Sequence, residues 1–228
     1  MTLTTDPPAR SPRSLLWAPA ARLLAVGVLL FAVLLGLGWL LTHVAPGTAF
    51  GDLDVGILQW LVAHRVPALD TASGYATDLA ATNTVTVLGL ATAVVASAVL
   101  RHWWPALLMV LAIGGELVLF LNSALLVGRQ RPAVAHLDAA LPATSSFPSG
   151  HTAAAICLFG GMAAIVVIAT RSWWRWVVVG VAVLLVVAVA ASRLYRGAHH
   201  PTDVLGSVLF AVPWLLLTAR TCAPLARH

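Results

Sequence analysis

The sequence contains no lysine, and all of its strongly basic residues are arginines. Charged residues of every kind make up only 9% of the 228 residues, whereas hydrophobic residues make up 60%. An average soluble domain is about one quarter charged, so this chain cannot cover a water-exposed surface of ordinary composition. The shortage of charge therefore argues against a soluble enzyme and predicts a membrane protein.

Cysteine is also scarce, and metal-binding clusters are missing from the sequence. The 2 cysteines, Cys157 and Cys222, fit neither a disulfide framework nor a site with paired cysteines. No compact group of carboxylates or thiolates demands a metal, so we expect no metal and no other cofactor. The formal net charge is +5, but the arginines do not cluster with aromatic residues, so we expect no nucleic-acid partner.

Six apolar segments approach the length of about 20 residues that a membrane-spanning helix requires. They cover residues 23–41, 79–100, 106–127, 152–170, 174–191 and 204–218. These segments lack the alternation of barrel strands, and helices satisfy their own backbone groups in lipid. We predict an all-α fold, a six-helix transmembrane bundle that forms a single domain over residues 1–228, with a flexible cytoplasmic segment at residues 1–22.

The distribution of arginine predicts the orientation of this bundle. One face carries both termini and eight arginines against a single acid, Asp6: Arg10, Arg13, Arg22, Arg101, Arg171, Arg175, Arg220 and Arg227. The positive-inside tendency makes this face cytoplasmic in a multi-pass protein of the cytoplasmic membrane. The connections 44–78, 128–150 and 193–203 then share the outer face. Within them, residues 52–65 have helical spacing and form either a helix flat on the outer leaflet or an ordinary packed loop helix.

Three polar clusters interrupt the apolar background on the predicted outer face. They are GRQRP at 128–132, FPSGH at 147–151 and SRLYRGAHHPTD at 192–203. Ionisable groups at membrane depth are costly and usually functional. Helix caps alone do not need two histidines, two arginines and an aspartate on one face. We therefore predict that the three clusters form a single site.

The residue types in these clusters suit the binding of a phosphate group. Arg131 and Arg193 have planar guanidinium groups that bind phosphate oxygens in pairs. Ser149 and Gly150 begin the fourth span, where free backbone N–H groups and the helix dipole favour an anion. His151 lies next to that anion and could donate a proton to a leaving oxygen.

A second histidine in the third cluster has a nearby carboxylate. Pro201 suits the first turn of the sixth span, which places Asp203 where it can reach back toward the entering chain. A carboxylate that bonds one imidazole nitrogen leaves the other free to attack phosphorus. We expect His199 to be that partner, with His200 as the competing choice.

Two of these motifs resemble a known family. PSGH at 148–151, together with Ser192-Arg193 followed by His199 and Asp203, is similar to the second and third signature motifs of the type 2 phosphatidic acid phosphatase superfamily. The resemblance extends over residues 107–218 and implies an integral-membrane lipid phosphatase that needs no metal.

The first motif of that family is incomplete in this chain. The family pattern is a lysine, six residues and then Arg-Pro, and only Arg131-Pro132 is present here, with Ala124 in place of the lysine. Arg129 and Arg196 are the two candidates for supplying the missing positive charge from another direction.

The resemblance also implies roles for individual residues. His199 would attack phosphorus and form a phosphohistidine, Asp203 would orient it, and His151 would protonate the leaving group. The phosphoryl oxygens would be held by Arg131, Ser149, Gly150 and Arg193. The candidate substrates are undecaprenyl pyrophosphate, phosphatidylglycerol phosphate and phosphatidic acid, hydrolysed at the outer face of the membrane, and the sequence does not rank them.

Two other functions fit the same clusters, and the oligomeric state is open. A lipid-linked phosphotransferase would pass the phosphoryl group from His199 to a hydroxyl group instead of water. A non-enzymatic phospholipid-binding or transport protein would keep the phosphate site without turnover, and the absence of the motif lysine leaves this alternative open.

Glu116 is an intramembrane carboxylate and therefore a further candidate functional residue. It lies about four helical turns, or roughly 22 Å, from Arg131 if the third span is continuous. We therefore expect an internal hydrogen bond or a partner on another span, and no direct contact with the phosphate.

Overall fold

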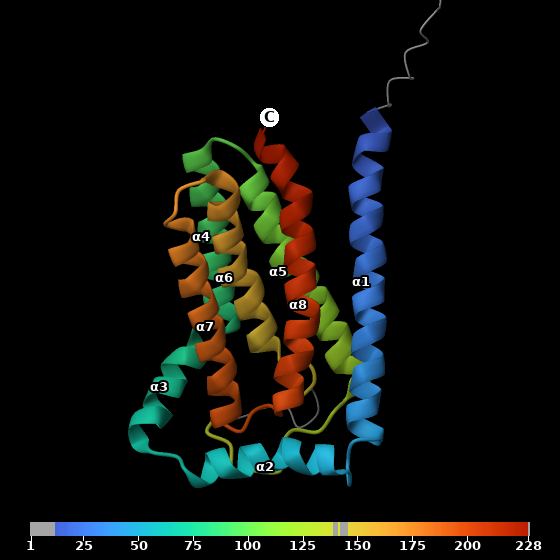
Figure 1. Cartoon of the computed structure of the whole chain (residues 1–228), viewed down its shortest axis with the longest axis vertical. Coiled ribbons are helices and arrows are strands. Elements are labelled where there is room, and N and C mark those ends of the chain that lie inside the picture. The colour runs from blue at the N-terminus through green and yellow to red at the C-terminus, as the bar shows by residue number, and fades with distance from the viewer. Residues whose placement is uncertain (1–11, 139–140, 142–145, 228) are drawn as a thin grey trace, which may run out of the picture.

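The regular elements of the chain are all helices in the computed structural model, which describes residues 12–138, 141 and 146–227. They are α1 (Pro12–His43), α2 (Ala49–Ala63), α3 (Pro67–Asp78), α4 (Thr82–Leu100), α5 (Trp104–Val127), α6 (Gly150–Ala169), α7 (Arg175–Tyr195), α8 (Pro201–Cys222) and the 3-10 helix η1 (Ala223–Arg227). The long helices stand side by side, and α2 lies across one end of them (Figure 1). The predicted all-α class is confirmed.

Six helices in the described part of the chain are long and apolar enough to cross a membrane. They are Ala18–His43, Thr82–Leu100, Trp104–Val127, Gly150–Ala169, Arg175–Tyr195 and Pro201–Ala226, and each contains most of one predicted span. Helix α1 begins at Pro12, so residues 12–22 of the segment predicted to be flexible are helical, and its flexibility stays a prediction. The alanines of this stretch favour continuation of the helix. Residues 1–11 lie outside the described residues.

The polar clusters lie at the opposite end of the bundle from the chain ends. Figure 1 shows the beginning of α1 and the C-terminus at one end, with the connections that follow α5 and α7 at the other. The α5–α6, α7–α8 and α1–α4 connections therefore share a face, as the alternation of spans predicts. Which of the two faces is cytoplasmic stays a prediction.

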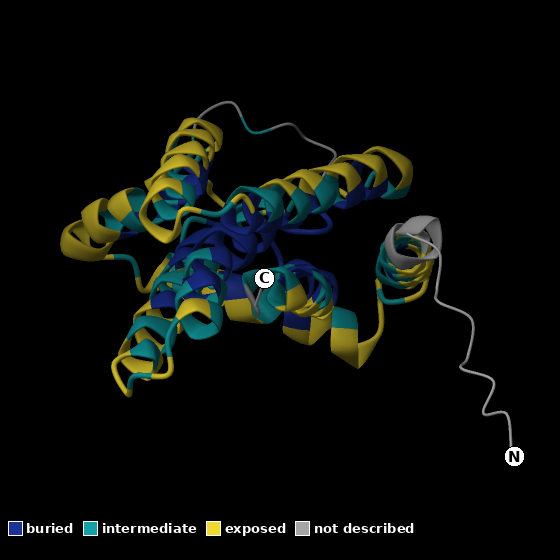
Figure 2. Cartoon of the chain, turned by 90° about the horizontal axis from the view of Figure 1, so that it is seen from above, coloured by how far each residue is buried: buried dark blue, intermediate teal, exposed yellow. Residues whose placement is uncertain are grey.

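Helix α6 is the centre of the bundle. Of its span, 56% is buried within the protein, against 11% for the span in α1. The view along the bundle shows buried residues gathered around the middle and exposed residues on the outer surfaces of the helices (Figure 2). Those outer surfaces carry large apolar side chains such as Val94, Leu125 and Leu184, as expected where lipid is the solvent. This arrangement places the beginning of α6 deep within the end that carries the polar clusters.

Two short helices cover that end of the bundle. Helix α2 buries Asp54 and Leu58 against the bundle and exposes Leu53 and Trp60, which agrees with the predicted helix at residues 52–65. Helix α3 packs against α7 and was not predicted from the sequence. Its polar and small residues give it no apolar run that distinguishes it from a loop.

Helices α5 and α8 approach closely because α5 has a glycine at the crossing. A Cβ atom on Gly115 would collide with the ring of Trp214 in α8. The indole N–H of Trp214 donates to the carbonyl oxygen of Leu111 at 3.0 Å. The contact fixes α8 beside α5, so that the residues at the beginning of α8 face those at the end of α5.

Candidate active site

One cavity brings the three polar clusters together. It has a volume of about 600 Å³, with walls formed mainly by α4, α5 and α6. Four charged or titratable side chains from the clusters line it: Arg131, His151, Arg193 and His199. The remaining wall is largely apolar and includes Val85, Ile113, Leu117, Phe120 and Leu121. The predicted convergence of both histidines and both arginines is therefore found, and the cavity has a polar part and an apolar part.

His199 is held in a fixed orientation by the loop before α6. Its Nδ1 atom lies 2.7 Å from the carbonyl oxygen of Ser146. A carbonyl oxygen only accepts hydrogen bonds, so Nδ1 carries the proton and Nε2 is left with a lone pair. The residue is only 3% exposed. Burial lowers the pKa of His199, and the nearby Asp203 carboxylate opposes this shift without reversing it, which favours the neutral nucleophilic form.

Asp203 acts on His199 mainly through Ser146, which corrects the predicted direct hydrogen bond. Asp203 Oδ2 lies 3.8 Å from His199 Nδ1, too far for a hydrogen bond. It accepts a hydrogen bond of 2.5 Å from the Ser146 hydroxyl group, whose residue supplies the carbonyl partner of His199. The same oxygen accepts the backbone N–H of His200 at 2.8 Å, which completes the predicted reach back to the entering chain.

A buried chain of carboxylates and arginine extends from Asp203 to α2. Arg129 donates to Asp203 Oδ1 at 2.5 Å and to Asp54 Oδ2 at 2.9 Å. Asp54 also accepts from the backbone N–H and the hydroxyl group of Thr202 at 3.0 Å and 2.7 Å. The sequence reasoning missed Asp54. The only local signal is that Asp54 shares a helix face with Leu58, four residues later.

Arg193 is bound by a second missed carboxylate, Asp138. Arg193 Nη1 donates to Asp138 Oδ2 at 2.8 Å and to the Thr77 hydroxyl group at 2.5 Å. Its Nε atom is buried and has no hydrogen-bond partner among the described residues. Burial by itself raises the pKa of Asp138, but Arg193 and Arg196 outweigh it and lower the pKa below the usual value. The guanidinium group of Arg193 is thus fixed in position, and its Nε–H group has no acceptor among the described residues.

Arg131 is the second cation on the cavity wall. Its Nη1 atom donates to the carbonyl oxygen of Ala198 at 2.6 Å. Burial and the positive charge of Arg193 lower the pKa of Arg131, yet an arginine keeps its charge at such a site. Two arginines that repel one another at a partly buried cavity form a strong site for a phosphate dianion.

The beginning of α6 completes the polar part of the cavity. Gly150 and His151 line the cavity, and a Cβ atom on Gly150 would lie 2.7 Å from the Phe120 ring. Glycine is therefore needed where α6 meets α5. Ser149 is buried behind this wall, where its backbone N–H donates to the Asp203 carbonyl oxygen at 3.2 Å and its hydroxyl group is 3.0 Å from that of Thr152. The next N–H groups in the first turn of α6 have no acceptor within the helix.

Neither candidate arginine occupies the position of the missing motif lysine. Ala124 lines the cavity. Arg129 is committed to Asp54 and Asp203, and Arg196 donates to Asp138 at 2.5 Å. Neither Arg129 nor Arg196 belongs to the described cavity lining. The wall that would carry the lysine is therefore apolar at this point.

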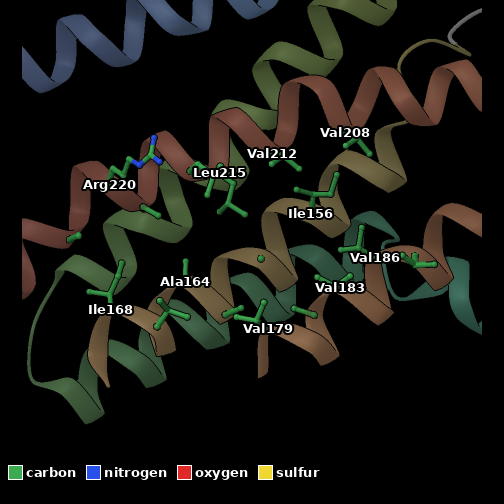
Figure 3. Close-up of a pocket in the computed structure, with 18 residues that line it drawn as sticks. Ile156, Ala164, Ile168, Val179, Val183, Val186, Val208, Val212, Leu215 and Arg220 are labelled. Atoms are coloured by element: carbon green, nitrogen blue, oxygen red, sulfur yellow. The ribbon is translucent and has the colours of Figure 1, made fainter. Parts of the chain in front are cut away.

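A second cavity, on the other side of α6, carries none of the predicted site residues. It has a volume of about 530 Å³ and lies between α6, α7 and α8. Figure 3 shows apolar side chains such as Ile156, Val183 and Leu215 along it and Arg220 toward one end. The described residues also contain no group of three or more histidine, cysteine or acidic side chains arranged to hold a metal ion. Of the predicted site residues, Arg131, Gly150, His151, Arg193 and His199 line the first cavity, whereas the fully buried Asp203 and Ser149 do not.

Known proteins provide an independent comparison with this geometry. A family model described as "PAP2 superfamily" matches residues 103–225. Phosphatidylglycerophosphatase B of Bacillus subtilis (strain 168) is 35% identical over 108 residues, which cover 46% of this chain and 52% of that protein. The matched region thus spans about half the length of this curated relative.

A solved structure is similar over most of both chains. It is the crystal structure of the first transmembrane PAP2 type phosphatidylglycerolphosphate phosphatase from Bacillus subtilis. The TM-score is 0.70 and the sequence identity is 26%, with 84% of this chain and 93% of the other chain covered. The similarity therefore includes the arrangement of the membrane-spanning helices, beyond the matched motifs.

Proposed function

This chain belongs to the PAP2 superfamily, and from that membership we propose that it is an integral-membrane lipid phosphatase. The family and the six-span helical fold inferred from the sequence are both confirmed. One observation carries the proposal: two histidines and two arginines line one end of a cavity whose other walls are largely apolar. Such a cavity suits a ligand with a phosphate group at one end and hydrocarbon at the other.

His199 is the proposed nucleophile. Its Nε2 lone pair forms a bond to phosphorus while the bond between phosphorus and the lipid oxygen breaks. His151, which the bound phosphate dianion keeps protonated, gives its proton to that leaving oxygen. Water then attacks the phosphohistidine and loses a proton to His151, and phosphate leaves as the P–N bond breaks. Each group returns to its initial state, so one water is consumed for each ester or pyrophosphate bond broken.

The other predicted residues bind the phosphoryl group or position the nucleophile. Arg131, Arg193 and the free backbone N–H groups of the first turn of α6, from Gly150 onward, hold the phosphoryl oxygens, and they stabilise charge that increases in the transition state. Ser149, predicted to share this role, is buried behind the cavity wall with its N–H bonded to Asp203. Asp203 is a positioning residue, because it holds Ser146, and the Ser146 carbonyl oxygen orients the His199 ring. Asp203 is therefore still proposed to orient His199, but through Ser146 and not through a direct hydrogen bond.

Phosphatidylglycerol phosphate is the substrate that the relatives favour. Both relatives are named for this substrate, and it ranks above phosphatidic acid and undecaprenyl pyrophosphate on that basis. The excess of arginine at the end with the chain termini supports hydrolysis on the extracytoplasmic side of the cytoplasmic membrane. Phosphate released in equal amount to the lipid consumed would exclude the alternative of a phosphotransferase.

The test is phosphate release from these three lipids by the purified protein and by His151→Ala. Loss of the proton donor should lower kcat/KM for the lipid by about 10²- to 10³-fold. With p-nitrophenyl phosphate the loss should be much smaller, because that leaving group departs without a proton. Thr86→Ala, at an exposed position of the same cavity away from the polar clusters, should stay within about twofold of wild type, since its hydroxyl group bonds only the Thr82 carbonyl oxygen of its own helix in the described structure. Equal losses for both leaving groups would contradict the role of His151.

Adding the family's missing lysine should increase the activity. Ala124→Lys places an ammonium group on the cavity wall that carries Arg131 and Arg193, and it should raise kcat/KM by about 10- to 100-fold, by analogy with one transition-state contact. Ala124→Met adds similar bulk without charge and should not raise the rate. An unchanged rate in Ala124→Lys would mean that the existing arginines already supply the charge that the phosphate needs.

A further inference from the structure

Glu116 is a buried acid on the wall of the active-site cavity, and the proposed mechanism does not use it. It is the only glutamate in the sequence and is 3% exposed. Its Oε1 atom is buried and has no hydrogen-bond partner among the described residues. The internal hydrogen bond expected from the sequence is therefore not made by this oxygen, although buried polar atoms almost always have a partner.

Glu116 lies closer to the reacting groups than its position in the sequence suggests. Helix α5 continues beyond the level at which α6 begins, because the Phe120 ring lies against Gly150. Glu116 precedes Phe120 by four residues, which is about one turn or 6 Å along the helix. The cavity itself extends from Arg131 and His199 to Glu116. The carboxyl group thus lies just below the phosphate-binding part, toward the membrane interior.

The apolar surroundings of Glu116 favour the neutral form of its carboxyl group. The cavity residues next to Glu116 on its own helix are Ile113, Leu117 and Phe120, and Ala154 faces them from α6. The described residues provide no ion pair to Glu116, and an isolated carboxylate among apolar groups would be very costly. The neutral carboxylic acid has an O–H group to donate and leaves the cavity without added negative charge.

A lipid whose phosphate binds at Arg131 and Arg193 would place the next part of its structure beside Glu116. In a diacylglycerol phosphate that part carries two ester carbonyl oxygens, which are good hydrogen-bond acceptors. In a polyprenyl phosphate the chain beyond the linking oxygen is hydrocarbon and contains no acceptor. Only the glycerolipid can satisfy the buried acid, and the polyprenyl lipid leaves it unpaired at a cost.

We propose that Glu116 is a specificity-determining residue that donates a hydrogen bond to an acyl ester carbonyl oxygen of a glycerolipid phosphate. The residue thereby selects diacylglycerol phosphates over polyprenyl phosphates at the same site. This inference rests on the proposed phosphatase function and adds to it the part of the substrate that is recognised.

The test is a cycle of two proteins and two substrates in the same detergent micelles. The proteins are the full-length wild type and Glu116→Leu, and the substrates are phosphatidic acid with ester-linked chains and its ether-linked analogue, which lacks the carbonyl oxygens. The wild type should prefer the ester lipid by about 10- to 100-fold in kcat/KM, the loss typical of one unpaired buried group. Glu116→Leu should lose that preference, with nearly equal values for both lipids.

Two further variants separate recognition from folding. Glu116→Gln keeps an N–H donor and should retain most of the ester preference. Ser123→Ala is the matched control, because Ser123 lies two turns along the same helix, is buried, also lacks a partner for its hydroxyl group among the described residues, and is not part of the cavity lining. Its preference should equal that of the wild type.

The outcomes distinguish this inference from the proposed function. A wild-type protein that releases phosphate from neither lipid, and none from phosphatidylglycerol phosphate, would contradict the phosphatase function itself. Release with equal kcat/KM for the two lipids in the wild type would overturn only the role of Glu116, and it needs no variant to fold. An ester preference that persists in Glu116→Leu would overturn it as well. With a polyprenyl monophosphate, Glu116→Leu should be at least as active as the wild type.

Discussion

Replacing His199 with alanine is expected to abolish phosphate release from every lipid substrate. The ring supplies the proposed attacking Nε2 atom, and its other nitrogen is fixed by the Ser146 carbonyl oxygen at 2.7 Å. Loss of a nucleophile from a preorganised site costs on the order of 10⁴- to 10⁶-fold in kcat. Phosphate release measured with purified protein in micelles should therefore fall to the level without enzyme.

The same substitution should also remove the covalent intermediate. With lipid labelled at the scissile phosphate and an alkaline quench, the wild type should carry a label that is stable to base and labile to acid, as a phosphohistidine is. His199→Ala should carry none. Externally added imidazole should restore part of the activity in His199→Gly, because it can occupy the space of the missing ring. A label of undiminished amount in His199→Ala would assign the nucleophile elsewhere.

The neighbouring histidine provides the matched control. His200 lies at the beginning of α8, where its backbone N–H donates to Asp203 Oδ2 at 2.8 Å and its ring Nδ1 lies 3.3 Å from the same oxygen. His200 is also outside the cavity lining. His200→Asn preserves a polar side chain at the helix start and should retain activity within about tenfold, as for the loss of a helix cap. A loss as large as that of His199→Ala would reverse the assignment of the two rings.

The spans were predictable from the sequence because a bilayer imposes a strong and local requirement. A helix in lipid needs a continuous apolar run, so hydropathy alone located all six membrane-spanning helices. Helix α3 carries no such signal and was missed. The polar clusters were also predictable, because alternation of the spans brings every second connection to the same end of the bundle.

The partners of the site residues were not predictable in the same way. Ser146 and Asp138 come from a connection with no periodic pattern, and Asp54 comes from the short helix α2. Their contacts with His199, Arg193 and Arg129 join positions more than 50 residues apart. Such pairings depend on the packed loops. The place of Glu116 on the same cavity was not predictable for a related reason: α5 extends past the first turn of α6, which a count of turns along one helix cannot reveal.

Arg129 illustrates how the structure changes the meaning of a motif residue. From the sequence it was a candidate for supplying the positive charge of the missing motif lysine. In the structure it joins two buried carboxylates, Asp54 of α2 and Asp203 of α8. Its charge therefore compensates acids that would otherwise be unpaired away from water, and the helix that covers the site is bound to the carboxylate that positions the nucleophile.

Arg129→Leu should consequently cause the largest loss of stability. Removing one partner of a buried ion pair leaves an uncompensated charge and costs about 3–5 kcal/mol, and here both Asp54 and Asp203 lose a hydrogen bond. Thermal unfolding in detergent should show a much lower midpoint for this variant. Asp203 and Ser146 are expected to shift once Arg129 is removed, so the remaining folded protein should also have a reduced kcat.

A comparison of variants separates the charge from the bulk of the side chain. Arg196→Leu removes an arginine of similar burial, but Asp138 keeps its hydrogen bond to Arg193, so its stability loss should be clearly smaller. Adding Asp54→Asn to Arg129→Leu removes one of the two unpaired charges and should recover part of the midpoint, because the two positions share one network. Equal losses in Arg129→Leu and Arg196→Leu would mean that the network contributes no more than a pair at the edge of the protein. A larger loss in the double variant would mean that Asp54 stabilises α2 mainly through Thr202, to which it also accepts two hydrogen bonds.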